Sequence, residues 1–286
     1  EFQYDLAFDR NIGWLTREEQ NRLRNSCVVI AGVGGTGGFQ AQVLARLGVG
    51  HFKLVDPDTF ELTNINRQIG ATVPTIGKFK AEVVREMIHQ INPKAEVEIH
   101  MKPLARNNAD EIFESANLAI DGIDFFEGNA KMVLYSKGME KGVPVITVAP
   151  IGFGGSLIIF TPEGMDPYSY FDYHDGLSEA DKRMALAFGL TPTPLCLQYM
   201  RPQAMDFEGK RASSVCPALM LAGAVTGTEA VKILTGRGKI FGAPHVYQLD
   251  LFTQQVRKSY YRWGMRSPWL RLKKFILKKY LNRKKT

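Results

Sequence analysis

The chain has 286 residues, of which 45% are hydrophobic and 23% are charged, a composition typical of globular domains. No apolar run approaches the ~20 residues that a membrane-spanning helix needs, and the first ten residues are too polar for a secretory signal. Three widely spaced cysteines, Cys27, Cys196 and Cys216, argue against a disulfide framework and a four-cysteine zinc site. We therefore expect a cytoplasmic chain without zinc.

The net charge of +7 is unevenly distributed along the chain. Residues 257–286 hold 12 of the 36 Lys and Arg residues and no Asp or Glu, so 24 basic and all 29 acidic residues precede them. Such asymmetry is typical of an interaction segment. We therefore treat 1–256 as one domain and 257–286 as a basic tail.

The first half of the chain alternates strand-like and helix-like segments. Short apolar runs predict strands at Cys27–Ala31, Phe52–Val55, Ala95–His100, Leu118–Ile120 and Val143–Val148. Helical periodicity lies between them, at 39–47, 80–91 and 128–141. Strands that alternate with helices predict a parallel sheet with helices on its faces. This half covers about 1–150.

The second half, about 151–256, is less regular. It predicts a strand at Ser156–Phe160, a surface loop at Thr161–Asp175, a helix at Ser178–Phe188, a helix at Pro217–Leu234, and an antiparallel pair at Val246–Leu251 and Gln255–Tyr260. The expected fold class is α/β: a Rossmann-like, mostly parallel sheet with helices on both faces and antiparallel extensions in its second half.

A glycine-rich turn follows the first predicted strand. It reads G-V-G-G-T-G, with glycines at Gly32, Gly34, Gly35 and Gly37. Glycines let the backbone approach a phosphate, and the helix that follows offers free N–H groups. Asp56 ends the second predicted strand, where an acidic residue commonly bonds a ribose hydroxyl. These features predict nucleotide binding, but the glycines alone do not distinguish NAD, FAD and ATP.

Further polar blocks follow in order. Asp56-Pro57-Asp58 leads to Asn64-Ile65-Asn66-Arg67-Gln68, and Gly77-Lys78-Phe79-Lys80 comes next. Together with the glycine turn, these blocks resemble the ThiF/MoeB adenylyltransferases, bacterial relatives of ubiquitin-activating enzymes. The resemblance covers about 5–150 and returns at 216–235. It implies ATP contacts at Gly32, Gly34, Gly35, Gly37, Asp56, Asp58, Asn64, Arg67, Gln68, Lys80 and Leu104.

The residue types suit the chemistry that this family performs. When a carboxylate attacks the α-phosphate of ATP, two anions meet, so fixed cations such as Arg67 and Lys80 must neutralise charge. A carboxylate is needed to hold Mg²⁺. By resemblance, Asp124 matches the metal-binding Asp of a T-D-N motif. The chain has Gly122-Ile123-Asp124-Phe125 there, and Asp121 is the alternative ligand.

The resemblance also implies partners. Arg10 matches an arginine that reaches the ATP phosphates of the other subunit, which implies a homodimer with shared sites. The acceptor is a carboxylate: the C-terminus of a ubiquitin-like protein, a peptide, a small molecule or a tRNA-borne acid. The aromatic segment Tyr168–Tyr173 is the expected acceptor region. We therefore take about 1–150 as the nucleotide half and about 151–256 as the acceptor half. Cys196, in an expected loop, and Cys216, at a helix start, are candidate thioester residues, although structural roles are favoured for both.

Two other functions remain open. An NAD- or FAD-dependent oxidoreductase would explain the glycine turn and Asp56 but would leave Arg67 and Lys80 without a role. An inactive relative that only binds partners would explain the altered T-D-N segment.

The tail predicts a basic amphipathic helix that starts at Ser267-Pro268 and carries Leu272, Ile276 and Tyr280 on one stripe. Three uses remain open: docking on the body of the protein, contact with tRNA or another polyanion, and contact with an anionic membrane surface.

Overall fold

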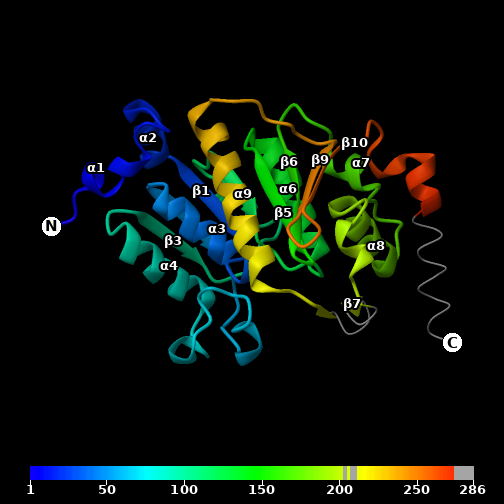
Figure 1. The fold of residues 1–286 in the computed structure, drawn as a ribbon, viewed down its shortest axis with the longest axis horizontal. Coiled ribbons are helices and arrows are strands. Elements are labelled where there is room, and N and C mark those ends of the chain that lie inside the picture. Colours follow the sequence, from blue (N-terminus) through cyan, green and yellow to red (C-terminus); the bar gives the residue numbers. More distant parts are fainter. Residues whose placement is uncertain (202–204, 207–210, 274–286) are drawn as a thin grey trace.

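The computed structural model describes residues 1–201, 205–206 and 211–273. Its centre is an eight-stranded sheet in the order β10-β9-β6-β5-β4-β1-β2-β3 (Figure 1). The five strands from β5 to β3 are parallel, and β6, β9 and β10 extend the sheet in antiparallel fashion. The predicted fold class is therefore confirmed.

The strand boundaries follow the predicted runs closely. The strands are β1 (Cys27–Ala31), β2 (His51–Val55), β3 (Glu96–His100), β4 (Leu118–Asp121), β5 (Val145–Ile151), β6 (Gly154–Phe160), β9 (His245–Asp250) and β10 (Gln255–Tyr260), with β7 (Met205–Asp206) and β8 (Arg211–Ala212) forming a separate pair.

The helices lie on both faces of the sheet (Figure 1). They are α1 (Tyr4–Ala7), α2 (Arg17–Arg24), α3 (Gly35–Arg46), α4 (Lys80–Ile91), α5 (Ala109–Ile112), α6 (Gly128–Lys141), α7 (Pro167–Phe171), α8 (Glu179–Leu190) and α9 (Cys216–Thr235). One buried cluster joins the sheet to α3, α4 and α9, and a second joins it to α6, α7 and α8. The apolar stripes that predicted the helices are the faces that these clusters bury.

Helix α9 packs closely on α3 because its contact positions are small. A Cβ at Gly223 would lie 3.1 Å from Phe39 Cβ, and a Cβ at Gly227 would overlap Val43. By length and composition α9 is long and apolar enough to cross a membrane, contrary to the expectation that no apolar run approaches that length. Its packing against α3 and β5 is that of a core helix.

The predicted surface loop at Thr161–Asp175 is wrong in its middle. Helix α7 forms there, and Tyr170 and Phe171 are fully buried. The Phe171 ring stacks on Tyr135 with 5.8 Å between centroids, and Tyr170 Oη donates to Gly189 O at 2.9 Å. Aromatic burial of this size outweighs the turn propensity of the flanking Pro and Gly residues.

The described part of the tail differs from the predicted stripe. A helical turn starts at Pro268, as predicted. Leu270 is the buried residue, whereas Leu272 is 48% exposed. Arg271 Nη2 binds the Asp172 carboxylate at 3.0 Å. The tail therefore docks its first turn through Leu270 and Arg271; Ile276 and Tyr280 lie outside the described residues.

Candidate functional site

The glycine turn crosses directly over the end of β4. Gly32 has φ +82°, a conformation that favours glycine. A Cβ on Gly37 or on Gly122 would overlap the carbonyl oxygen of Gly32. The loop therefore needs glycine at these three positions to bring the start of α3 to the edge of the sheet where β1, β2 and β4 end.

The Asp56 side chain fixes the position of this loop through hydrogen bonds. Its carboxylate is 4% exposed and accepts hydrogen bonds from Val33 N at 2.8 Å and from Asp58 N at 2.9 Å. Burial raises the pKa of Asp56, and the bond from Asp58 N and the charge of Lys80 act in the opposite direction. Asp56 thus ties the glycine loop to the segment after β2, a role that adds to the predicted ribose contact.

Lys80 is fixed at the start of α4. Its side chain is 10% exposed, and Nζ lies 3.0 Å from the outer carboxylate oxygen of Asp58. The backbone N of Lys80 also donates to Asp58 O at 2.9 Å. Since Asp58 is mostly exposed, the ammonium sits at the rim of the site with one protein anion beside it, and its remaining donors are available to a phosphate.

The segment before Lys80 is a compact turn. Asn64 is buried, and its side chain accepts from Glu61 N at 3.0 Å. Arg67 donates through Nη1 to Thr63 O and to Asn66 Oδ1, both at 3.0 Å. Among the described residues Arg67 has no carboxylate partner, so its guanidinium charge is not neutralised. Asn64 therefore builds the turn, and Arg67 projects from it.

Gln68 lies against the glycine loop. Its Oε1 is buried without a hydrogen bond, and a Cβ on Gly34 would lie 3.0 Å from that atom. A buried acceptor without a partner is uncommon and needs an explanation. A bound ligand or water at the loop would supply the donor that the described residues do not.

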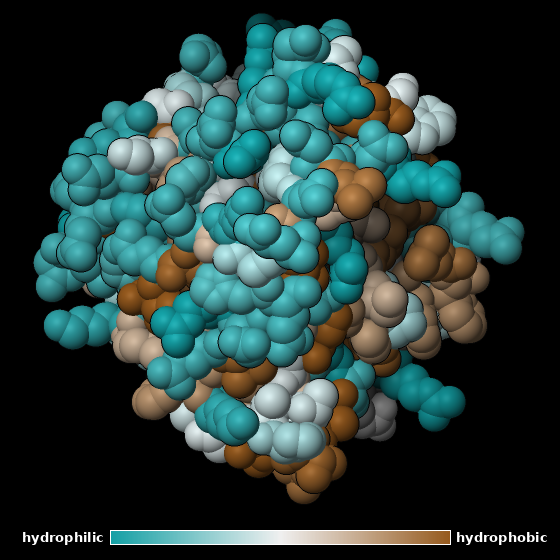
Figure 2. All heavy atoms as spheres, turned by 90° about the vertical axis from the view of Figure 1, so that its left-hand side faces the viewer, coloured by the Kyte–Doolittle hydropathy of each residue, from teal (hydrophilic) through white to brown (hydrophobic). Residues whose placement is uncertain are grey.

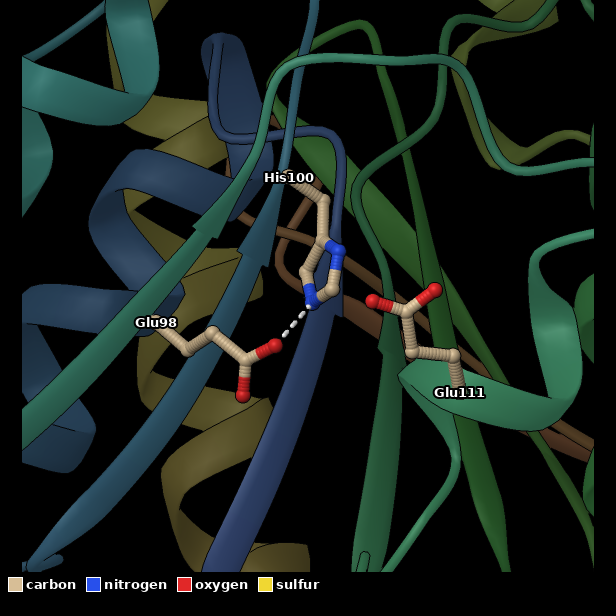
Figure 3. A group of neighbouring side chains, drawn as sticks. All are labelled: Glu98, His100 and Glu111. Atoms are coloured by element: carbon tan, nitrogen blue, oxygen red, sulfur yellow. Dashed lines mark ion pairs between the residues drawn. The ribbon is translucent and has the colours of Figure 1, made fainter.

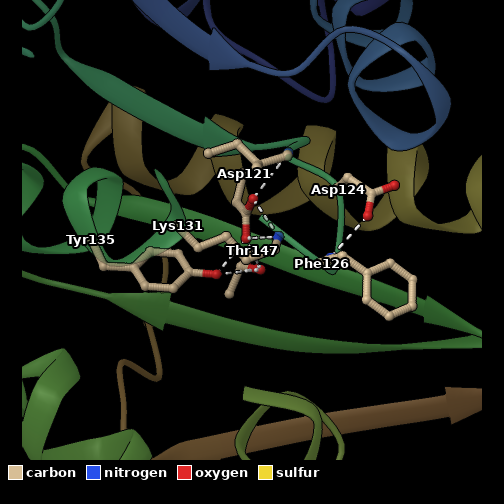
Figure 4. Close-up of polar contacts among 7 residues, drawn as sticks. Asp121, Asp124, Phe126, Lys131, Tyr135 and Thr147 are labelled. Carbon is tan, nitrogen blue, oxygen red and sulfur yellow. Dashed lines mark hydrogen bonds and ion pairs between the residues drawn. The ribbon is translucent and has the colours of Figure 1, made fainter. Parts of the chain in front are cut away.

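The two candidate metal ligands have opposite environments (Figure 4). Asp121 is 3% exposed, and Lys131 Nζ donates to its two oxygens at 2.8 and 2.9 Å. Thr147 Oγ1 donates at 2.8 Å, and the Tyr135 hydroxyl also donates. Burial and the Asp121 charge raise the pKa of Tyr135 well above its ordinary value. Asp121 is thus a fully bonded structural carboxylate.

Asp124, three residues further on, is exposed. One of its oxygens accepts from Phe126 N at 2.8 Å, and the carboxylate points away from the Asp121 cluster in Figure 4. A single backbone bond orients the carboxylate and leaves lone pairs for a cation. Of the two candidates, Asp124 fits a Mg²⁺ ligand and Asp121 does not.

A cavity of about 330 Å³ lies between the segment after β3 and helices α6 and α7. Leu104, a predicted nucleotide contact, lines it together with Arg106, Asn129, Tyr168 and Tyr173. Tyr173 Oη donates to Asn129 Oδ1 at 2.9 Å. The aromatic segment is therefore divided between this cavity and the core. Arg106 and Asn129 were not predicted from the sequence, because neither belongs to a motif.

Arg10 lies apart from these residues. It is exposed in a short 3-10 turn, Asp9–Asn11, that Asn11 anchors by donating to Gln20 Oε1 at 3.0 Å. Within the described part of this chain no hydrogen bond or ion pair holds the Arg10 side chain. Its action on a second subunit stays a prediction.

Cys27 and Cys196 are not arranged as nucleophiles, whereas Cys216 is half-buried at the start of α9 and its thioester role stays a prediction. Cys196 is 1% exposed, and burial, together with the charge of Asp250, raises the pKa of its thiol. Burial likewise raises the pKa of Cys27. The candidate thioester role of Cys196 is therefore wrong for this conformation, because neither access nor a lowered pKa is present.

A second group of possible metal ligands lies at the sheet edge (Figure 3). One ligand atom each from Glu98, His100 and Glu111 lie within 4.8 Å of one another. His100 Nε2 is 2.8 Å from Glu98, and Lys53 Nζ lies 3.6 Å from the same carboxylate. Because Lys53 supplies a positive charge to the group, we explain it as an ion-pair network and assign no metal to it.

The fold and the site together define a nucleotide-binding α/β protein, with a glycine loop, two cations and a free carboxylate at the carboxyl ends of adjacent parallel strands. The model of the ThiF family matches residues 8–262. The chain belongs to the ThiF family.

Relatives carry several names. The chain is 30% identical over 244 residues to the "Probable adenylyltransferase/sulfurtransferase MoeZ" of Mycobacterium tuberculosis, covering 84% of this chain and 56% of that protein. It is 36% identical over 140 residues to the tRNA threonylcarbamoyladenosine dehydratase of Haemophilus influenzae, covering 48% of this chain and 52% of that protein. The chain thus spans about half the length of these two relatives. Against the sulfur carrier protein adenylyltransferase of Thermus thermophilus, identity is 28%, over 88% of this chain and 84% of that protein.

Solved structures agree on the fold. The crystal structure of PaaA superimposes with a TM-score of 0.63 at 23% identity, covering 90% of this chain and 79% of that one. The crystal structure of Escherichia coli MccB with ATP superimposes with a TM-score of 0.62 at 19% identity, covering 87% of this chain and 67% of that one.

Proposed function

We propose that this protein is an ATP- and Mg²⁺-dependent adenylyltransferase that activates a carboxylate. The observation that carries the proposal is the contrast between Asp121, the last residue of β4, and Asp124, three residues later. Asp121 is bonded to Lys131 and Thr147, whereas Asp124 accepts one backbone hydrogen bond and is left for a cation, at the edge of the sheet where the segments that carry Lys80 and Arg67 also lie. Relatives named as adenylyltransferases support the same activity.

In the proposed reaction, an oxygen of the acceptor carboxylate attacks the α-phosphorus of ATP. The new carboxyl-to-phosphorus bond gives an acyl-adenylate, and the bond to the β-phosphate breaks, releasing pyrophosphate. The acceptor is already ionised at neutral pH, so no side-chain base is required. Catalysis then consists of positioning and charge neutralisation.

Each cation has a defined task in this scheme. Arg67 offers a planar set of N–H donors to phosphate oxygens, and Lys80 offers a compact charge. Asp124 would hold Mg²⁺, which neutralises charge on the phosphates. The unpaired Oε1 of Gln68 and the N–H groups at the start of α3 would contact the nucleotide where it crosses the glycine loop.

The oxidoreductase alternative fits the site less well. It leaves the uncompensated guanidinium of Arg67 and the free carboxylate of Asp124 without a task. The inactive-relative alternative is countered by the same two groups, because a guanidinium without a carboxylate partner among the described residues and an exposed carboxylate are retained where the reaction needs them.

We also propose that the active form is a homodimer in which Arg10 serves the partner's site. The face over the N-terminal elements is mostly hydrophilic with apolar side chains among them (Figure 2). Exposed apolar residues of the first eighty positions include Leu6, Trp14, Leu62, Ile65, Val73 and Phe79. Exposed apolar side chains of this kind suit a subunit contact.

The acceptor is best described by its chemistry, a free carboxylate on a protein C-terminus, a peptide, a small molecule or a tRNA-borne acid. A structure of E. coli MccB contains the peptide MccA, which makes a peptide a reasonable first choice.

Exchange of labelled pyrophosphate into ATP, measured with pooled peptides that bear free C-termini, tests the reaction. We expect exchange that depends on both peptide and Mg²⁺. Peptide-dependent formation of ADP and phosphate instead would contradict the proposal, because it places the attack at the γ-phosphate.

A further inference from the structure

A groove of about 470 Å³ lies far from the nucleotide loop, along the outer edge of β10. It is bounded by Arg257–Trp263 on one side and by the C-terminal turn around Trp269 and Lys273 on the other. Figure 1 places this turn beside β10, at the end of the sheet farthest from β3. We propose that this groove binds an extended acidic peptide segment, which pairs with β10 as an additional strand.

Among the described residues, no strand pairs with the outer edge of β10. Tyr261 N donates to Pro244 O at 3.1 Å, and Ser259 and Arg257 are paired with Val246 and Gln248. Because hydrogen-bonding direction alternates along an antiparallel strand, the N–H and C=O groups of the intervening residues point outward. These residues are Val256, Lys258 and Tyr260. An exposed strand edge of this kind is a template for another strand.

The charge of the groove favours an acidic partner. Arg257, Lys258, Arg262 and Lys273 line it, and none of them forms an ion pair with a described acidic residue. The remaining sequence, 274–286, adds six basic residues and no acidic one. The chain's own tail therefore cannot neutralise the groove, and a partner must supply the negative charge.

Aromatic side chains give the groove an apolar lining. Tyr260, Trp263 and Trp269 are 59%, 62% and 63% exposed. A concave groove beside a strand edge suits an extended chain better than a flat lipid surface, since alternate side chains of an added strand would face these rings.

The direction of β10 connects this groove to the proposed function. β10 runs opposite to β5, β4 and β1, so an antiparallel added strand would end at the same edge as Gly32 and Asp124. Five strand spacings separate it from β4, roughly 24 Å, which about seven extended residues can span. One part of the inference rests on the proposed function: the bound peptide is the acceptor and presents its C-terminus to ATP.

Fluorescence anisotropy with a labelled peptide that alternates Glu and Thr tests the binding directly, without nucleotide. We expect saturable binding that weakens with salt, and no binding of the matching Lys-Thr peptide. The double substitution Arg257→Glu with Lys258→Glu should weaken binding by about tenfold or more, because surface charge pairs are modest individually but reversal also adds repulsion. Lys94→Glu, an exposed residue outside the groove, is the matched control.

Backbone pairing has its own test. Val256→Pro removes an outward-pointing N–H without changing charge or a bond to β9, so it should weaken peptide binding, whereas Val256→Thr should not. If Val256→Pro fails to fold, N-methylated probe peptides replace it. Methylation of the residues whose N–H groups would face β10 should abolish binding, and methylation of the residues between them should not.

Several results would overturn the inference. The first is that the Glu-Thr peptide does not bind, and the second is that the β10 variants bind it as tightly as the original protein. The third is that methylation of either set of peptide residues has the same effect, and the fourth is that binding is lost only when 274–286 are deleted. Flotation with phosphatidylserine vesicles in place of peptide binding would also overturn it in favour of a membrane surface. MgATP binding, measured separately on each variant, distinguishes these failures from failure of the proposed adenylation.

Discussion

Lys131 Nζ lies within 2.9 Å of both carboxylate oxygens of Asp121, in a pocket where both side chains are almost fully buried. The pair joins α6 to the end of β4 just before the chain turns toward Asp124. We therefore expect it to determine where Asp124 is placed, while taking no part in the chemistry itself.

Lys131→Met should destabilise the protein by about 3–5 kcal/mol, because it leaves a buried carboxylate without its cation. The midpoint of denaturant unfolding measures this effect. Lys137→Met on the same helix is the control: the ion-pair partners of Lys137, Asp110 and Glu140, are exposed, so its loss should leave stability close to that of the original protein. Unchanged stability of Lys131→Met would show that the Asp121 pair does not support the fold.

Arg67→Ala and Lys80→Ala should each lower the rate of pyrophosphate exchange by about a hundred- to a thousandfold, because each removes one donor that stabilises charge in the transition state. Lys78→Ala, an exposed neighbour of Lys80, is the control. Exchange at the original rate in either variant, with circular dichroism unchanged, would remove that residue from the site.

Mixing Arg10→Ala chains with Lys80→Ala chains should restore part of the lost exchange activity. In the mixed dimer one site would contain both intact residues, if Arg10 serves the partner. Activity of a purified, doubly tagged heterodimer measures this effect. A heterodimer as inactive as either parent would argue against shared sites.

Tyr199 should make stability fall at high pH. Burial and the hydrogen bond to Asp250, at 2.6 Å, raise the pKa of Tyr199 to about 12. The unfolded chain loses this proton near the ordinary pKa of about 10, so the stabilisation is complete below that pH and is lost as pH rises toward 12. Unfolding midpoints at pH 9 and 11 should differ less in Tyr199→Phe than in the original protein, and an equal difference would contradict this assignment.

Sequence reasoning was most accurate where one periodicity dominated. Helices α4 and α6 begin and end at the predicted residues, Lys80–Ile91 and Gly128–Lys141, because their apolar stripes are bounded by clear stop signals. It failed at Tyr170 and Phe171, since long-range aromatic packing with Tyr135 overrides local turn signals.

The site residues also differ in how well the sequence predicts them. The glycine loop, Asp56 and Lys80 follow from motifs whose residues are close in sequence. The motif resemblance favours Asp124 over Asp121, but the physical reason does not follow from the motif, because it depends on Lys131 and Thr147, which lie on other elements. Likewise, the burial of Cys196 depends on contacts that no spacing predicts.

Calorimetric titration of the original protein and of Asp124→Asn with ATP, with and without Mg²⁺, and with NADH tests the central claim most directly. The account predicts that the original protein binds ATP in preference to NADH and that Mg²⁺ strengthens ATP binding, whereas Asp124→Asn loses this effect of Mg²⁺ and remains folded. Tighter binding of NADH than of ATP, or an undiminished effect of Mg²⁺ in Asp124→Asn, would contradict it.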